Sequence, residues 1–293
     1  MKSVALHPGT EISFAPSLAI GSMISIQLAA ALSRPLLIEM GATATTMIRL
    51  AAAAIVLLAF TRPKPQLLPN GALLGALLLG VSLAGMTVCF FEAVKRIPLG
   101  LVTTIAFIGP LAVATLGSRR PIELLCAALA AVGVALLVRP YATGWIADTG
   151  GLVLAMAAAA CWASYIVFTK RVGAAFEGLQ GLAISLLVAA IVVVPIGVHQ
   201  LQGWPPLSSL AAAAALALLA PLLPCCLEMM ALRRMGARPF GILMSLEPAI
   251  GLAIGFILLR QEPNLPQLLG VACVVSASAG IVAAAGHLHD GCG

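Results

Sequence analysis

Apolar residues follow one another in long blocks along this chain, and short polar breaks separate the blocks. A helix that crosses a bilayer needs about 20 apolar residues. The pattern predicts ten such helices, over residues 13–33, 41–60, 71–94, 98–117, 121–138, 149–169, 178–198, 208–232, 239–259 and 265–285. The breaks are too short to hold a soluble domain. The chain is therefore expected to be an all-α polytopic membrane protein.

Composition points the same way, because 61% of the residues are hydrophobic and only 9% are charged. Soluble domains carry about 25% charged residues. A lipid bilayer is therefore the expected partner of most of the outer surface. The formal net charge is +6, but the basic residues lie in short breaks and form no stripe with interleaved aromatic rings. We therefore expect no binding to nucleic acid.

The basic residues also predict an orientation, because loops rich in Lys and Arg stay in the cytoplasm. With both termini inside, ten of the 16 Lys and Arg residues fall in cytoplasmic breaks and five in outer ones. Both termini are therefore expected in the cytoplasm. The first apolar block is longer than the 7–15 residues of a signal-peptide core, so it is expected to stay as the first helix. Lys95–Arg96, on the outer side, is the discordant feature.

An internal repeat accounts for that discordance. A shift of 138 residues aligns Lys95–Arg96 with Arg233–Arg234 and Pro110 with Pro248. Each unit holds five predicted helices, an odd number, so the second unit enters the membrane upside down. We predict two inverted five-helix repeats, at residues 13–138 and 149–285. Secondary transporters are often built in this way, with a binding site near the midplane between the halves.

Charged residues inside the predicted helices are costly, by about 2.5–3.5 kcal/mol at a helix centre. Arg49 lies near the middle of the second helix and could clamp a substrate carboxylate, pair with a buried Glu, or extend to the interface. Glu247 precedes Pro248 in the ninth helix, where a disturbed helix could line a cavity. It is read as a site residue or as a structural ion-pair partner of Arg49. Glu228 fits a site role and a structural role equally well.

Other candidates carry weaker signals. Gly109–Pro110 is the counterpart of Glu247–Pro248, and matching kinks in both halves are typical of transporters, although helix-end packing is an equal alternative. Gln27, Trp162 and Tyr165 could line the same cavity or only pack between helices. Glu92 is expected to pair with Lys95 three residues later on the same helix face.

Several kinds of chemistry are excluded by absent motifs. The chain has no Walker motif and no HExxH, and its seven cysteines form no zinc-type spacing. No Ser/His set or paired Asp for hydrolysis falls within the predicted helices. We therefore expect no cofactor, no metal and no enzymatic activity.

Nearly the whole chain resembles the drug/metabolite transporter superfamily, in its ten-helix branch with two EamA-type repeats. Within that branch it is most similar to the bacterial threonine and homoserine exporters. The resemblance is carried by Ser25-Ile-Gln27, Arg49-Leu-Ala51, Val81-Ser-Leu-Ala-Gly-Met86, Phe107-Ile-Gly-Pro110, Ser118-Arg-Arg-Pro121, Cys161-Trp-Ala-Ser-Tyr165, Leu227-Glu-Met-Met-Ala-Leu232 and Phe240-Gly-Ile-Leu-Met-Ser-Leu-Glu-Pro248. Two positions depart from the family pattern: Ala106 stands where a Glu is common, and Cys225 where an aromatic residue is usual.

The resemblance implies a multi-pass protein of the bacterial inner membrane that exports small amino acids in exchange for protons. Under that hypothesis Arg49 holds the substrate carboxylate. Glu247, with Glu228 as a possible second acid, exchanges protons and binds the substrate ammonium group. The alternatives are an exporter of other metabolites or toxic compounds and, in a different class, a membrane scaffold or an enzyme acting on lipid-linked substrates.

Overall fold

The computed structural model describes residues 8–63, 71–97, 99–116, 120–138, 148–201, 203–259 and 265–290. Within these residues all regular structure is helical. The helices are α1 (Pro8–Leu32), α2 (Arg34–Thr61), α3 (Ala72–Val94), α4 (Leu99–Ala106), α5 (Ile108–Thr115), α6 (Pro121–Val138), α7 (Thr149–Ala175), α8 (Gln180–Gln200), α9 (Leu207–Leu216), α10 (Leu223–Arg234), α11 (Ala237–Leu243), α12 (Glu247–Leu259) and α13 (Leu265–Asp290). A π-helical turn, Leu218–Leu222, joins α9 to α10, and a 3₁₀ turn, Met244–Leu246, joins α11 to α12.

These elements match the predicted spans. Seven helical stretches among the described residues are long and apolar enough to cross a membrane, judged by length and composition. Two shorter apolar helices, Pro121–Leu136 and Leu268–Gly280, coincide with the fifth and tenth predicted spans. The fourth span is α4 followed by α5, with a break at Phe107. The prediction of an all-α polytopic membrane protein is confirmed.

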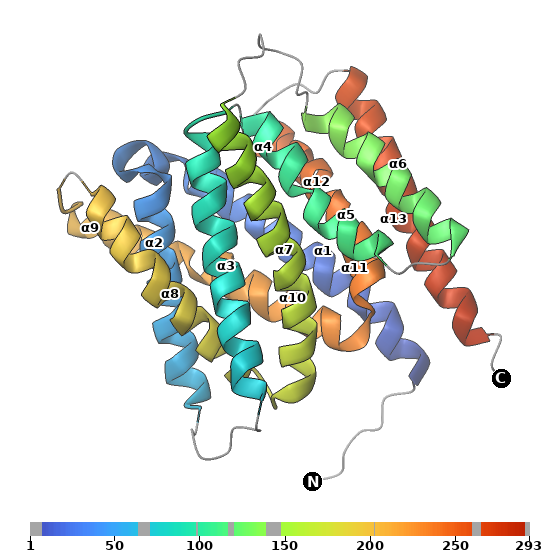
Figure 1. The fold of residues 1–293 in the computed structure, drawn as a ribbon, viewed down its shortest axis with the longest axis horizontal. Helices are drawn as coiled ribbons and strands as arrows, with labels where there is room; N and C mark the ends of the chain where they lie inside the picture. The colour runs from blue at the N-terminus through green and yellow to red at the C-terminus, as the bar shows by residue number, and fades with distance from the viewer. Residues whose placement is uncertain are drawn as a thin grey trace.

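Helices from the first half of the chain pack mainly on helices from the second half. α3 lies against α7 and α8, α2 against α8, and α1 against α10 and α12. α6 and α13 form a long pair along one side of the bundle (Figure 1). The halves therefore share one core and do not form two separate ones.

The packed pairs also correspond when each helix is exchanged with its counterpart in the other half. The pair α3–α7 corresponds to α10–α1, and α3–α8 corresponds to α9–α2. The pair α5–α7 corresponds to α12–α1, whereas α2–α8, α5–α11 and α6–α13 each map onto themselves. The first turn of α1 and the last turn of α13 lie toward the same end of the bundle (Figure 1).

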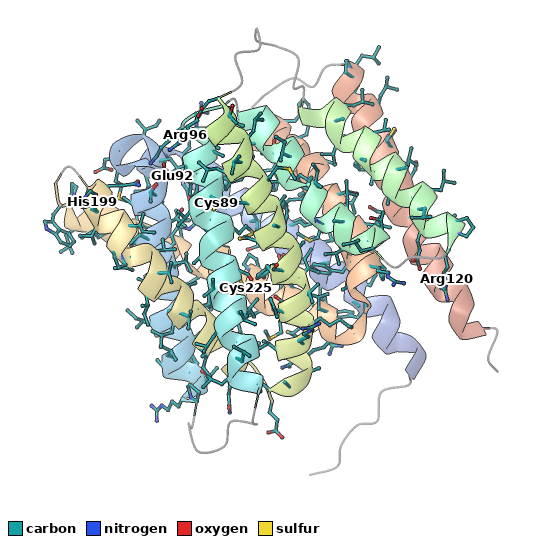
Figure 2. All side chains as sticks on the ribbon, viewed as in Figure 1. Cys89, Glu92, Arg96, Arg120, His199 and Cys225 are labelled. Carbon is teal, nitrogen blue, oxygen red and sulfur yellow. The ribbon has the colours of Figure 1, made fainter. Side chains whose placement is uncertain are left out.

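The two basic pairs found in the sequence lie at opposite ends of α7. The Arg96 guanidinium lies against Gly150, at the start of α7, while Arg233 donates to the carbonyl of Gly173 near its end. These glycines are separated by about 35 Å at 1.5 Å per residue. Figure 2 shows Arg96 and Glu92 toward one end of the bundle and Cys225 at mid-height.

Four spans are interrupted. α2 was predicted to begin at residue 41, and the structure extends it back to Arg34 through a non-helical Gly41 with φ of 78°. The fourth span breaks at Phe107, so Gly109 and Pro110 fall in the first turn of α5, where proline is well tolerated. The eighth span carries the π-helical turn and the ninth the 3₁₀ turn.

Small residues set the distance between helices, as is usual in lipid. Gly80 on α3 faces α8 so closely that an added Cβ would lie 2.5 Å from the Ser185 carbonyl oxygen. The Ser185 hydroxyl donates to the Ala76 carbonyl at 2.9 Å, which ties the same two helices together. The Ser185 carbonyl oxygen and the Val188 Cβ occupy this space, and rotation of a side chain moves neither of them, so a larger residue cannot be accommodated in that way.

We therefore expect Gly80→Ala to destabilise the fold by about 1–3 kcal/mol, the usual cost of overpacking. A melting curve of the purified protein in detergent measures this loss. Gly21→Ala is the matched control, because its Cβ would meet only Leu227 at an ordinary 3.6 Å. Equal melting temperatures for the two variants would contradict the close α3–α8 approach.

Candidate functional site

A cavity of about 300 Å³ lies inside the bundle, between α1, α2, α3, α7 and the interrupted eighth and ninth spans. Its lining is largely apolar and aromatic, and includes Phe90, Phe91 and Trp162. Three charged side chains reach it: Arg49, Glu228 and Glu247. A cavity of mostly apolar walls with a few convergent polar groups is the usual form of a small-molecule site.

Glu228 is buried, with 4% of its surface exposed, and both its oxygens accept hydrogen bonds. Ser22 on α1 donates to Oε1 at 2.6 Å, and Tyr165 on α7 donates to Oε2 at 2.8 Å. Burial of a carboxyl group is costly unless its oxygens are satisfied in this way. Glu228 thus links α10 to α1 and α7.

Glu247 is satisfied much less well. It begins α12, directly after the 3₁₀ turn, where a helix N-terminus favours negative charge. Its Oε1 lies 3.5 Å from Gln27 Nε2, at the limit of a hydrogen bond. Its Oε2 is buried and, among the described residues, has no hydrogen-bond partner. One oxygen of Glu247 is therefore available for a ligand or a proton.

Arg49 is directed at a break in the helix opposite. Within the π-helical turn, Ala220 has an extended backbone (φ −160°, ψ 129°), and the prolines at 221 and 224 lack N–H groups. Arg49 Nε donates to the Ala220 carbonyl at 2.7 Å, and Ser25 donates to the Leu219 carbonyl at 2.6 Å. Two successive carbonyls freed by the break thus receive side-chain donors, as required where water is absent.

The expected alternative of an ion pair between Arg49 and Glu247 is wrong for this conformation. No carboxylate of the described residues lies within 4.0 Å of Arg49, and its second contact is Nη1 to the Ser33 hydroxyl at 3.1 Å. The guanidinium instead donates to the Ala220 carbonyl at the break in the eighth span. Since a guanidinium has five N–H donors, its Nη2 group remains free within the described structure.

The other predicted residues divide into two groups. Trp162 and Tyr165 line the cavity, and the Trp162 ring lies 4.9 Å from that of Phe107. Gln27 reaches the cavity through Glu247. Gly109 and Pro110 are buried in α5 against α7 and α11 and do not line the cavity.

Pro248 is the second residue of α12, and its side chain lies outside the described part of the chain. Within the described residues, no three His, Cys, Asp or Glu side chains come together in a way that could hold a metal ion.

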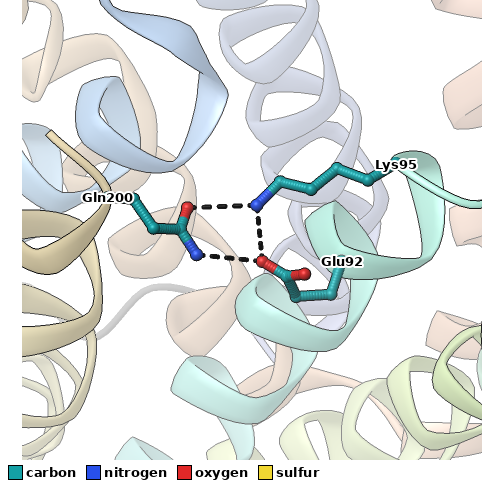
Figure 3. Close-up of polar contacts among 3 residues, drawn as sticks. All are labelled: Glu92, Lys95 and Gln200. Atoms are coloured by element: carbon teal, nitrogen blue, oxygen red, sulfur yellow. Dashed lines mark hydrogen bonds and ion pairs between the residues drawn. The ribbon is translucent and has the colours of Figure 1, made fainter. Parts of the chain in front are cut away.

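Glu92 belongs to a separate cluster near one end of the bundle. Lys95 Nζ lies 2.6 Å from Glu92 Oε1, and Gln200 contacts both side chains at 3.0 and 3.1 Å (Figure 3). Glu92 does not line the cavity, and its carboxylate is bound by Lys95, directly after α3, and by Gln200 on α8.

Sequence reasoning missed three serines, two on α1 and one directly after it. Ser22 binds Glu228, Ser25 satisfies Leu219, and Ser33 binds Arg49. Their positions fall on one face of a helix, three and eight residues apart, and this polar stripe on an apolar helix was the signal available.

Comparison with known proteins identifies the family to which this chain is similar. Residues 149–283 match the EamA-like transporter family. The chain is 38% identical over 263 residues to the threonine/homoserine exporter RhtA of Escherichia coli K12, with 88% of each chain covered. It is equally similar to RhtA of Salmonella typhimurium LT2, again 38% identical over 88% of both chains.

The fold itself has been seen in a solved crystal structure. That chain superposes with a TM-score of 0.75 at 20% sequence identity, covering 95% of the present chain and 99% of its own length. The similarity of fold therefore extends over the whole bundle. The family model and the RhtA relatives both describe transporters. This chain belongs to the EamA-type transporters of the drug/metabolite transporter superfamily, close to the RhtA exporters.

Proposed function

We propose that this protein exports small amino acids such as threonine and homoserine across the bacterial inner membrane, in exchange for protons and by alternating access. The names of its RhtA relatives support the substrate class. The observation that carries the proposal is the pair of unsatisfied groups at one cavity. These are the Nη2 of Arg49 and the Oε2 of Glu247, neither of which has a partner among the described residues.

A zwitterion suits this pair. The guanidinium of Arg49 would bind the substrate carboxylate with donors that the protein leaves unused. Glu247 would bind the ammonium group or, without substrate, a proton. A cationic compound would match Glu247 and meet repulsion from Arg49, and a sugar would leave both charges poorly paired.

The two acids would have different tasks. Glu228 already accepts hydrogen bonds from Ser22 and Tyr165, so its part in this proposal is to position α1, α7 and α10. Glu247 has an oxygen without a partner among the described residues, so in this proposal it is the acid that exchanges protons.

Alternating access would use two inverted five-helix repeats, at residues 13–138 and 149–285, with both termini in the cytoplasm. The correspondence of the helix pairs under exchange of the halves supports this arrangement. So does the placement of Arg96 and Arg233 at opposite ends of α7.

Topology is tested by labelling. In a cysteine-free protein, a single cysteine in place of Arg96 should react with an impermeant maleimide in intact cells. A single cysteine in place of Arg234 should react only after the inner membrane is opened. Labelling of both positions from the same side would contradict the inverted repeats.

The tasks of the acids are tested by comparing three variants. Glu247→Gln should lower proton-coupled flux in proteoliposomes by about 30-fold or more, because the ammonium group of the bound substrate would lose its charged partner. The melting temperature should not fall. Glu228→Gln, in contrast, should lower the melting temperature in addition to the flux, because it replaces one of the two buried oxygens that accept hydrogen bonds from Ser22 and Tyr165. Glu92→Gln is the control outside the cavity and should keep near-normal flux. Normal flux in a well-folded Glu247→Gln protein would exclude Glu247 from coupling.

Substrate class is tested in cells. Overexpression should protect against excess homoserine or threonine more strongly than against cationic dyes, because only a zwitterion satisfies Arg49 and Glu247 together. Growth inhibition curves with and without the protein measure this order. The reverse order would favour an exporter of toxic compounds, and no effect of any solute together with no flux in proteoliposomes would favour a scaffold or lipid-acting enzyme.

A further inference from the structure

Two basic side chains cross between α7 and α10 at the end of the bundle farther from Arg96. Lys170, on α7, extends its Nζ to the Leu232 carbonyl at 3.0 Å and to the Met235 carbonyl at 2.7 Å. Leu232 lies in the last turn of α10 and Met235 directly follows that helix, where backbone acceptors have no partner within the helix. Lys170 therefore caps the C-terminus of the neighbouring helix.

Arg233, on α10, caps the C-terminus of α7 in turn. From α10, its Nε donates to the Gly173 carbonyl at 2.7 Å, and its Nη2 donates to the Phe176 carbonyl at 2.9 Å and to the Gly178 carbonyl. Each helix thus provides the cation that complements the negative C-terminal end of the other. We call these two side chains and their five hydrogen bonds the reciprocal cap.

The reciprocal cap lies beyond the cavity along the same two helices. Tyr165 and Glu228, which line the cavity, join α7 to α10 by their own hydrogen bond of 2.8 Å. Lys170 lies five residues after Tyr165, and Arg233 lies five residues after Glu228. The cap is therefore a second tier of contacts between the same two helices, beyond the cavity.

The corresponding end of the other half is arranged differently. α7 packs on α10 and α11, but within the described residues α1 makes no comparable contact with α3 or α4. The 138-residue shift aligns Arg233 with Lys95, yet Lys95 bonds to Glu92 on its own helix and to Gln200 on α8. Phe90, Phe91 and Ala106, near the ends of α3 and α4, line the cavity on that side. The capped end thus carries a tier of hydrogen bonds between α7 and α10 for which the described residues show no equivalent between α1 and α3.

We propose that Lys170 and Arg233 are the gate at the cytoplasmic end of the cavity, and that the reciprocal cap must separate before the cavity opens to the cytoplasm. The assignment of this end to the cytoplasm rests on the proposed function. Arg233 is exposed, so water can take over the freed carbonyls when the helices part, and the gate can reopen and close repeatedly. Lys170 and Arg233 are positioning residues and do not touch the substrate.

The gate is tested by the accessibility of Cys225, which lines the cavity between Tyr165 and Glu228. All other cysteines are replaced, and a small thiol reagent is applied from each side of oriented membrane vesicles. The double variant Lys170→Met/Arg233→Met should raise the labelling rate from the cytoplasmic side about tenfold and lower it from the outer side. Arg234→Met is the matched control, because the neighbouring Arg234 makes no hydrogen bond within the described structure.

Labelling needs no transported solute, so it is read independently of the substrate proposal. Unchanged rates in a double variant that folds would overturn the gate. If the double variant does not fold, the two single variants, each of which keeps half of the cap, should also raise the labelling rate of Cys225 from the cytoplasmic side. Unchanged rates in both single variants would overturn the gate. A rise from the outer side instead would support the gate and overturn the assigned membrane orientation.

Discussion

A backbone carbonyl inside a membrane-spanning bundle needs a hydrogen-bond donor, and the break in the eighth span depends on that constraint. The extended backbone at Ala220 frees two successive carbonyls at membrane depth. Ser25 and Arg49 satisfy them from two different helices. The break therefore fixes where α1 and α2 lie against the eighth span, and it brings a guanidinium to the cavity wall. Without this exchange of donors, an interrupted helix here would be too costly to keep.

The same constraint separates the roles of the two acids. Glu228 meets the cost of burial with two short hydrogen bonds, so it contributes to the arrangement of three helices. Glu247 has one buried oxygen without a partner among the described residues. Such a group in a native structure needs an explanation, and a ligand or a proton would complete it, which is why we propose the chemistry of transport for Glu247 and a positioning role for Glu228.

The two halves correspond in their helix pairs but differ in the residues that fill equivalent places. Gly109 stands where the second half has Glu247, and it lies in contact with α7 instead of lining the cavity. Both cavity acids thus come from the second half, while Arg49 comes from the first. The ends differ too, because α7 and α10 are capped by each other's cations, whereas the described residues show no such pair of caps between α1 and α3. The residues around the cavity are therefore asymmetric although the helix pairs correspond.

The sequence alone determined the membrane spans, the all-helical class and the family, because burial in lipid depends on a local sum of apolar residues. It also indicated Arg49 and Glu247, since a charge at membrane depth is costly wherever the helices pack. Only the tertiary structure decided their partners. Arg49 binds a carbonyl 171 residues away instead of Glu247, and Glu228 meets Ser22 across 206 residues. Such contacts depend on where helices break and which faces meet, and a linear pattern of hydrophobicity carries neither.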